Sequence, residues 1–107
     1  MSKRTALVAA VTLASVALAA YAADHVVAQK DKQFSVRTLK IKVGDSVTFR
    51  NDDPYFHNIF SLSSARTFDL GSFPKGESRS VTFDKAGTVD VECAIHPQMK
   101  MTIEVGK

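Results

Sequence analysis

The chain of 107 residues contains one cysteine, Cys93, and only three histidines. One cysteine cannot form a disulfide within the chain, which excludes the disulfide framework common in small exported domains. A dinuclear copper site bridged by thiolates would need a second cysteine. So few histidines in so short a chain also exclude a multicopper oxidase.

The sequence also lacks repeats, low-complexity tracts, linkers and any cluster of basic side chains. Without a basic cluster we expect no binding of nucleic acid. The formal net charge is +3 at pH 7, and Lys3 and Arg4 supply two of these charges, so the rest of the chain carries about +1. We expect the remaining scattered charges to form an ordinary solvated surface.

The first part of the chain is typical of a secretory signal peptide. Its short basic head is followed by an apolar run over residues 5–20 and by an A-x-A cleavage pattern that ends at Ala22. The run is shorter than the roughly 20 apolar residues that a spanning helix needs, so we expect no stable membrane anchor. We therefore predict a signal peptide at 1–22, one domain at 23–107 and a periplasmic location.

Beyond residue 22, apolar residues alternate with polar ones over short runs, which indicates β-strands with one buried face. Turn-forming residues separate these runs, and no helical pattern of ten residues appears, so we predict an all-β antiparallel sandwich or barrel. The predicted strands cover 39–43, 47–50, 57–62, 81–84, 89–93 and 99–105, with a further strand around Phe34 and Val36. Residues 63–76 have the least regular pattern, because glycine and proline interrupt it.

The segment C-A-I-H-P-Q-M begins with Cys93, at the end of a predicted strand where a loop starts. His96 follows the cysteine by three residues and Met99 follows it by six, so one loop can supply three side chains to a metal ion. His57 lies far upstream at the edge of another predicted strand. Strand pairing in a sandwich can bring His57 to the same end of the domain.

The chemistry of these four side chains favours copper. One thiolate, two imidazoles and a weakly bound thioether are the ligands of a blue-copper electron-transfer site. Zinc fits less well, because a thioether is not among its usual ligands. Taken singly, each residue has a more ordinary interpretation: a surface histidine, a methionine that fills the core, or an inert buried thiol. Their combination favours copper bound by His57, Cys93, His96 and Met99.

Four segments resemble the cupredoxin family, the small type 1 (blue) copper proteins such as plastocyanin, pseudoazurin and amicyanin. They are V-G-D-S-V-T-F-R-N at 43–51, H-N-I-F at 57–60, F-D-K-A-G at 83–87 and C-A-I-H-P-Q-M at 93–99. The resemblance covers nearly all of residues 23–107. It implies a Greek-key β-sandwich of about seven to eight strands, with one type 1 copper ion held by His57, Cys93, His96 and a methionine.

Two methionines are candidates for the axial ligand in such a protein. Met99 gives the spacing C-x2-H-x2-M, which is most similar to the amicyanin loop, and Met101 gives C-x2-H-x4-M. We favour Met99, because Met101 belongs to an alternating apolar pattern that gives it a role in the core. The proline usually found just before the upstream histidine is displaced to Pro54, so we expect the surface beside the copper to differ in shape.

The resemblance also implies roles for the residues around the copper. Asn58 matches the residue whose backbone amide points at the cysteine sulfur, and its side chain is a candidate to tie the two ligand loops together. We expect His57 to be buried and His96 to expose the ring edge through which electrons leave. The apolar surface around that edge would comprise residues 54–56, Ile95, Pro97 and Gln98.

The leading functional interpretation is a monomeric periplasmic carrier of single electrons, which is not an enzyme by itself. Its redox partners would be proteins such as a c-type cytochrome or a periplasmic dehydrogenase. The amicyanin-like loop also suggests an accessory of an amine dehydrogenase. The alternative is a copper chaperone or scavenger that uses the same ligands, although trafficking sites are often rich in Met or His and open to solvent.

Cleavage after Ala22 would leave Ala23, Asp24 and His25 at the amino terminus. A free amine with histidine in the third position can bind Cu(II) in a square plane through the amine, two amide nitrogens and the ring. A second Cu(II) site at the amino terminus is therefore an alternative that the sequence leaves open.

Overall fold

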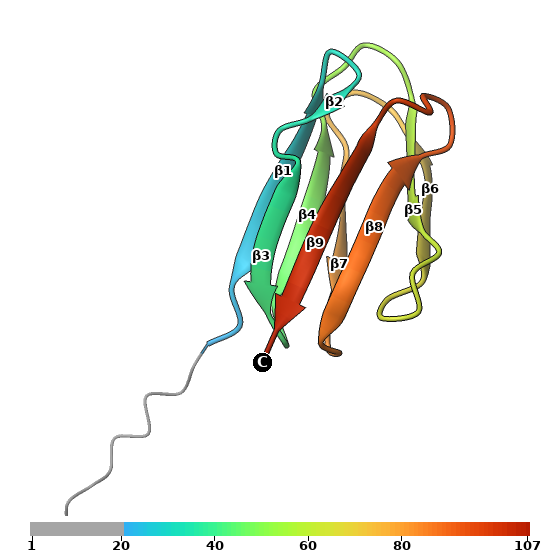
Figure 1. The fold of residues 1–107 in the computed structure, drawn as a ribbon. Coiled ribbons are helices and arrows are strands. Elements are labelled where there is room, and N and C mark those ends of the chain that lie inside the picture. Colours follow the sequence, from blue (N-terminus) through green and yellow to red (C-terminus); the bar gives the residue numbers. More distant parts are fainter. Residues whose placement is uncertain (1–20) are drawn as a thin grey trace, which may run out of the picture.

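Residues 21–107 form two facing β-sheets in this computed structural model, which describes that part of the chain (Figure 1). The strands are β1 (Asp24–Lys30), β2 (Gln33–Phe34), β3 (Thr38–Lys42), β4 (Ser46–Asn51), β5 (His57–Ser61), β6 (Phe68–Phe73), β7 (Ser78–Thr82), β8 (Gly87–Cys93) and β9 (Lys100–Gly106). The predicted all-β sandwich is confirmed, with nine strands where seven to eight were expected. No helix among these residues is long and apolar enough to span a membrane.

One sheet has the order β2-β1-β4-β7 and the other the order β3-β9-β8-β5-β6. The pairs β1–β4 and β3–β9 are parallel, and the other paired strands run antiparallel. Strands that are distant in sequence are therefore neighbours in both sheets. Most of the predicted signal peptide lies outside the described residues.

Three strands differ from the sequence prediction, and one of them, β7, occupies Ser78–Thr82 instead of 81–84. β1 occupies Asp24–Lys30, ahead of the strand expected around Phe34 and Val36, of which only the two-residue β2 is present. β6 occupies Phe68–Phe73, within the segment expected to be least regular. Its pairing with β5 shifts register between Asn58 and Phe60, so a bulge breaks the period of two that a regular strand would show.

The core lies between the sheets and is built from the apolar residues of the alternating runs. The fully or almost fully buried apolar side chains are Val27, Ile41, Val47, Phe49, Ile59, Phe73, Val81, Phe83, Val89, Val91, Cys93, Met99, Met101, Ile103 and Val105. The thiol and both candidate methionines thus belong to the packed interior. Because protein interiors are close-packed, these side chains are held in fixed positions.

The β1–β2 turn, the β4–β5 loop and the β8–β9 loop lie at the end of the sandwich opposite the C-terminus (Figure 1). The β1–β2 turn consists of Asp31 and Lys32, whose φ angles are +53° and +55°. Two left-handed residues are what a tight two-residue hairpin of this twist requires, although the conformation is uncommon for a lysine. This end of the molecule carries the predicted metal ligands.

Candidate metal centre

Three of the predicted ligands meet at this end of the sandwich. His57 is the first residue of β5 and Cys93 is the last residue of β8, and these strands pair antiparallel with Ile59 opposite Cys93. His96 comes from the β8–β9 loop. Among the described residues, the nitrogen and sulfur atoms of these three side chains form a group that could hold a metal ion.

The three facing atoms form a compact triangle. Cys93 Sγ lies 3.6 Å from His57 Nδ1 and 3.7 Å from His96 Nδ1, and the two Nδ1 atoms are 3.2 Å apart. A point equidistant from all three lies about 2.0 Å from each, close to the roughly 2.0–2.3 Å that imidazole nitrogen and thiolate sulfur keep from a borderline metal ion. The triangle therefore fits one copper ion in a trigonal set of two nitrogens and one sulfur.

The two histidines differ in exposure as the sequence predicted. His57 is 0% and Cys93 is 2% exposed, whereas His96 is only partly buried. Burial lowers the pKa of His96, and the neighbouring His57 and Lys32 lower it further. A lowered pKa favours the neutral imidazole, which is the form that binds a metal.

Met99 closes the ligand loop, whereas Met101 lies within a strand. Met99 N donates a hydrogen bond to His96 O at 2.9 Å, and Cys93 N donates one to Met99 O at 3.3 Å. Both side chains are buried, but Met101 is paired with Val91 within the β8–β9 ladder, one pair before its end. Met99 is thus tied by its backbone to two of the three clustered ligands.

Asn58 ties the ligand segments together through its backbone and not through its side chain. Ala94 N donates a hydrogen bond to Asn58 O at 2.9 Å, which joins β5 to the start of the β8–β9 loop. The buried Oδ1 atom of Asn58 has no hydrogen-bond partner in the protein. The expected side-chain link is therefore not what connects these two segments.

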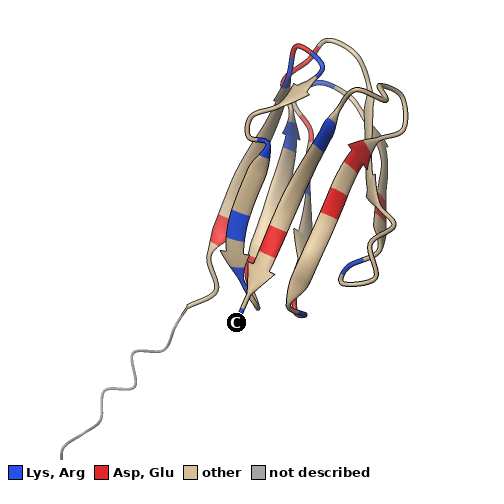
Figure 2. Cartoon of the chain, in the orientation of Figure 1, with Lys and Arg blue, Asp and Glu red and all other residues tan. Residues whose placement is uncertain are grey.

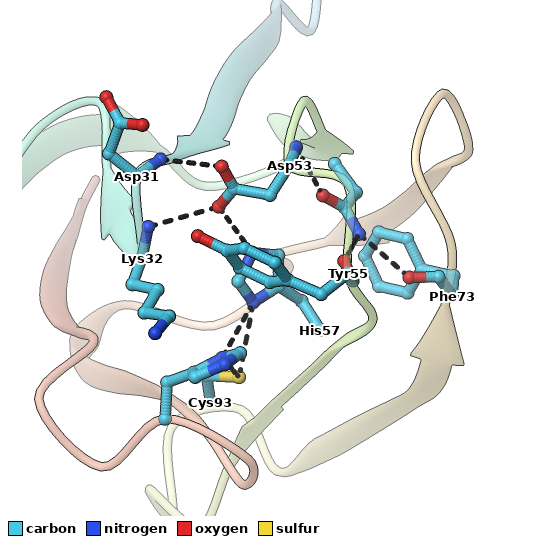
Figure 3. Close-up of polar contacts among 9 residues, drawn as sticks. Asp31, Lys32, Asp53, Tyr55, His57, Phe73 and Cys93 are labelled. Carbon is cyan, nitrogen blue, oxygen red and sulfur yellow. Dashed lines mark hydrogen bonds and ion pairs between the residues drawn. The ribbon is translucent and has the colours of Figure 1, made fainter.

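Asp53 is part of the site although the sequence patterns did not single it out. Its side chain is 1% exposed, and its Oδ2 atom lies 2.8 Å from Nε2 of His57, on the far side of the ring from Cys93 (Figure 3). Burial raises the pKa of Asp53, but hydrogen bonds from His57, Lys32 and Asp31 outweigh burial and leave that pKa below its usual value. The only sequence signal was its spacing of four residues before the histidine.

Tyr55 is a second residue of the site that the sequence did not single out, since it was expected only as part of the surface segment 54–56. Its ring centroid lies 5.5 Å from that of His57 in an edge-on arrangement and 5.3 Å from that of His96. The Lys32 ammonium lies 5.4 Å from the same ring (Figure 3). Tyr55 therefore packs against both histidines and restricts the motion of their rings.

The residues of the possible amino-terminal copper site make hydrogen bonds to Asp45 and belong to a paired strand. Asp45 accepts hydrogen bonds from Ala23 N at 2.9 Å and from Lys42 N at 3.0 Å, and His25 Nε2 lies 3.0 Å from its carboxylate. Asp24 and His25 also belong to β1, which pairs with β4. Wrapping around Cu(II) would break these contacts, so the fold disfavours this second site.

Comparison with known proteins agrees with the geometry. Residues 21–106 match the model of a family described as copper binding proteins, plastocyanin/azurin family. The methylamine utilization protein MauL of Methylorubrum extorquens is 31% identical over 97 residues, which cover 90% of this chain and 85% of MauL. Amicyanin of Paracoccus denitrificans is 32% identical over 76 residues, which cover 68% of this chain and 58% of that protein.

Solved structures show the same likeness. An amicyanin variant in the Cu(I) state superposes with a TM-score of 0.71 at 28% identity, covering 77% of this chain and 81% of amicyanin. A copper-containing nitrite reductase from Thermus scotoductus SA-01 superposes with a TM-score of 0.74 at 27% identity. The match covers 78% of this chain but 22% of the reductase, so it corresponds to only part of that larger protein.

Proposed function

Because the chain belongs to the plastocyanin/azurin family of copper-binding proteins, we propose that it carries single electrons between redox proteins in the periplasm. Copper is its cofactor, and the chain is a cupredoxin similar to amicyanin and MauL, not an enzyme. The copper ligands are His57, Cys93 and His96, with Met99 as the weak axial ligand.

The observation that carries the proposal is the triangle of His57, Cys93 and His96. The three atoms face one another at 3.2–3.7 Å, on strands packed into the core and on a short loop tied back to them. An electron carrier needs a site that changes little between its two oxidation states. Imidazole nitrogen with soft sulfur is a compromise between the preferences of Cu(II) and Cu(I), and the packed core keeps these side chains in place.

The surface around His96 suits a brief encounter with a redox partner. Phe56 is 54% and Ile95 is 48% exposed, and the prolines Pro54 and Pro97 are exposed beside them. The segment 94–99 of the β8–β9 loop carries no charged residue, and charges of both signs are spread over the strands (Figure 2). A small apolar patch supports weak, short-lived association.

The proposal includes export and processing. The basic head, apolar run and A-x-A pattern before Ala23 support a signal peptide at 1–22, removed to leave a periplasmic domain at 23–107. Electrons would pass between proteins such as a c-type cytochrome and a periplasmic dehydrogenase. The name of MauL, a methylamine utilization protein, supports a partner in amine oxidation. We expect the carrier to be a monomer.

Visible spectroscopy and voltammetry of the copper-loaded protein test this function. We expect an intense visible band from charge transfer between the Cys93 thiolate and Cu(II), and reversible one-electron reduction. Cys93→Ser should abolish the band. A colourless Cu(I) resting state that readily gives up its copper to an acceptor protein would instead indicate a chaperone and contradict the carrier function.

A further inference from the structure

The Asp53 carboxylate lies directly behind a predicted copper ligand. It is 1% exposed and accepts three hydrogen bonds from N–H groups. Oδ2 lies 2.8 Å from His57 Nε2 and 3.1 Å from Lys32 N, and Oδ1 lies 2.6 Å from Asp31 N (Figure 3). An ionised carboxylate can only accept hydrogen bonds, so it needs several donors around it when it is buried, and Asp53 has three.

Two of the donors come from the strained turn between β1 and β2. Asp31 and Lys32 both have positive φ angles, and successive N–H groups in such a turn can form a concave binding site for an anion. The left-handed conformation is unfavourable for a residue with a side chain such as Lys32. Because both N–H groups of the turn bind Asp53, the N-terminal hairpin holds the carboxylate next to His57.

The backbone of Asp53 is fixed independently of its side chain. Asp53 N donates a hydrogen bond to Asn51 Oδ1 at 2.8 Å. The buried amide of Asn51 in turn donates to Tyr55 O at 2.8 Å and to Phe73 O at 2.9 Å. The carboxylate is thus placed by β4, the hairpin turn and β6 together, which leaves it little freedom to move.

We propose that Asp53 is a positioning residue for the copper ligand His57 and that its negative charge favours Cu(II) over Cu(I). This inference rests on the copper site proposed above. Because the carboxylate is an acceptor, His57 carries its ring proton on Nε2, which leaves Nδ1 unprotonated and directed at Cys93 and His96. A histidine held in this way by a carboxylate is a more basic ligand.

The charge of Asp53 should influence the reduction potential because it is buried and screened little by solvent. A negative charge beside the metal stabilises the divalent ion more than the monovalent one. Loss of such an outer-shell partner typically weakens metal binding 10- to 100-fold. If a tenfold loss falls on Cu(II) alone, the reduction potential rises by about 59 mV.

The test compares Asp53→Asn with the matched control Asp52→Asn, both loaded with copper. Asp52 is the neighbouring carboxylate, but it is partly exposed and pairs with Arg50 on the surface. We expect Asp53→Asn to keep the visible band, bind Cu(II) 10- to 100-fold more weakly and show a raised reduction potential. Asp52→Asn should have the same visible band, Cu(II) affinity and reduction potential as the wild type. An unchanged potential in a blue, folded Asp53→Asn protein would overturn the proposal.

A second measurement needs no variant, in case Asp53→Asn does not fold. Nitrogen-15 NMR of the wild-type protein, copper-free and in the Cu(I) form, should show His57 protonated on Nε2, with a deshielded proton typical of a bond to a carboxylate. A proton on Nδ1, or an undeshielded Nε2 proton, would refute the role of Asp53. Absence of a visible band in the wild type would refute the copper site itself, so the two failures are distinguishable.

Discussion

At the scale of single residues, Met99 and Met101 differ in where the backbone places them relative to the ligand loop. Met99 closes the loop that carries His96, whereas Met101 is paired with Val91 inside the β8–β9 ladder. We expect Met99→Leu to shift the visible band and the reduction potential of the copper-loaded protein. Met101→Leu should leave both unchanged, and each swap should cost less than about 1.5 kcal/mol, because leucine nearly conserves the volume. The reverse pattern would make Met101 the axial ligand.

Asp45 gives the protein a pH dependence that is separate from the copper site. Hydrogen bonds from Lys42 N, the His25 side chain and Ala23 N lower the pKa of Asp45 from 3.8 to about 2. A carboxylate with a lowered pKa stabilises the fold fully above its unfolded pKa and loses this effect as pH falls through the folded value. We therefore expect the stability that Asp45 contributes to decline between pH 4 and about 2.

Denaturant unfolding across pH 2–6 measures this contribution when the wild type is compared with Asp45→Asn. The variant keeps the shape of the side chain but cannot ionise, so the difference in unfolding free energy should be constant above pH 4 and shrink toward pH 2. A difference that stays constant down to pH 2 would show that the Asp45 carboxylate does not titrate with a lowered pKa.

The clustered ligands could be predicted from the sequence because their chemistry is rare in this chain. Cys93 is the single cysteine and His96 follows it within one loop. Asp53 and Tyr55 could not be predicted in the same way. Carboxylates and aromatic rings are common, and the roles of these two depend on contacts with the β1–β2 turn and with both histidines, which exist only in the folded chain.

At the scale of elements, the start of β8 depends on a glycine. Gly87 has a φ of +148°, and a Cβ atom there would lie 2.7 Å from Ala65 Cβ. We expect Gly87→Ala to lower the free energy of unfolding by about 1–3 kcal/mol, because of both the clash and the backbone strain. In the control Gly106→Ala, the new Cβ would lie 3.7 Å from Ile41 O, an ordinary contact, so a change within about 0.5 kcal/mol is expected.

Urea unfolding of the two alanine variants provides the comparison, since strand β8 ends at the copper ligand Cys93. If Gly87→Ala proves as stable as Gly106→Ala, the contact between the start of β8 and the loop at Ala65 is not a constraint on the fold.

Strand prediction succeeded where the period of two was unbroken and failed where it was not. Val89, Val91 and Cys93 face the core as the alternation in β8 predicts. In β1 the inward position after Val27 is occupied by Gln29, a buried polar side chain, so the apolar alternation is lost. In β6 the apolar alternation is also lost, because a bulge lies opposite Asn58 and Phe60.

At the scale of the whole molecule, the sandwich brings together residues that are distant in sequence. The connections at one end include the hairpin turn that binds Asp53, the β4–β5 loop that carries Asp53 and Tyr55, and the β8–β9 loop that carries His96 (Figure 1). Alternation predicted two packed sheets, but not that β1 pairs in parallel with β4. That pairing depends on long-range packing, which local periodicity does not encode.

X-ray absorption at the copper edge of the loaded wild-type protein tests the central claim most directly. If the metal lies within the triangle of His57, Cys93 and His96, the first coordination shell contains two imidazole nitrogens and one short sulfur contact. Little change in these distances should accompany reduction to Cu(I), because the packed strands fix the ligands. A shell of nitrogen and oxygen atoms without sulfur would contradict the account.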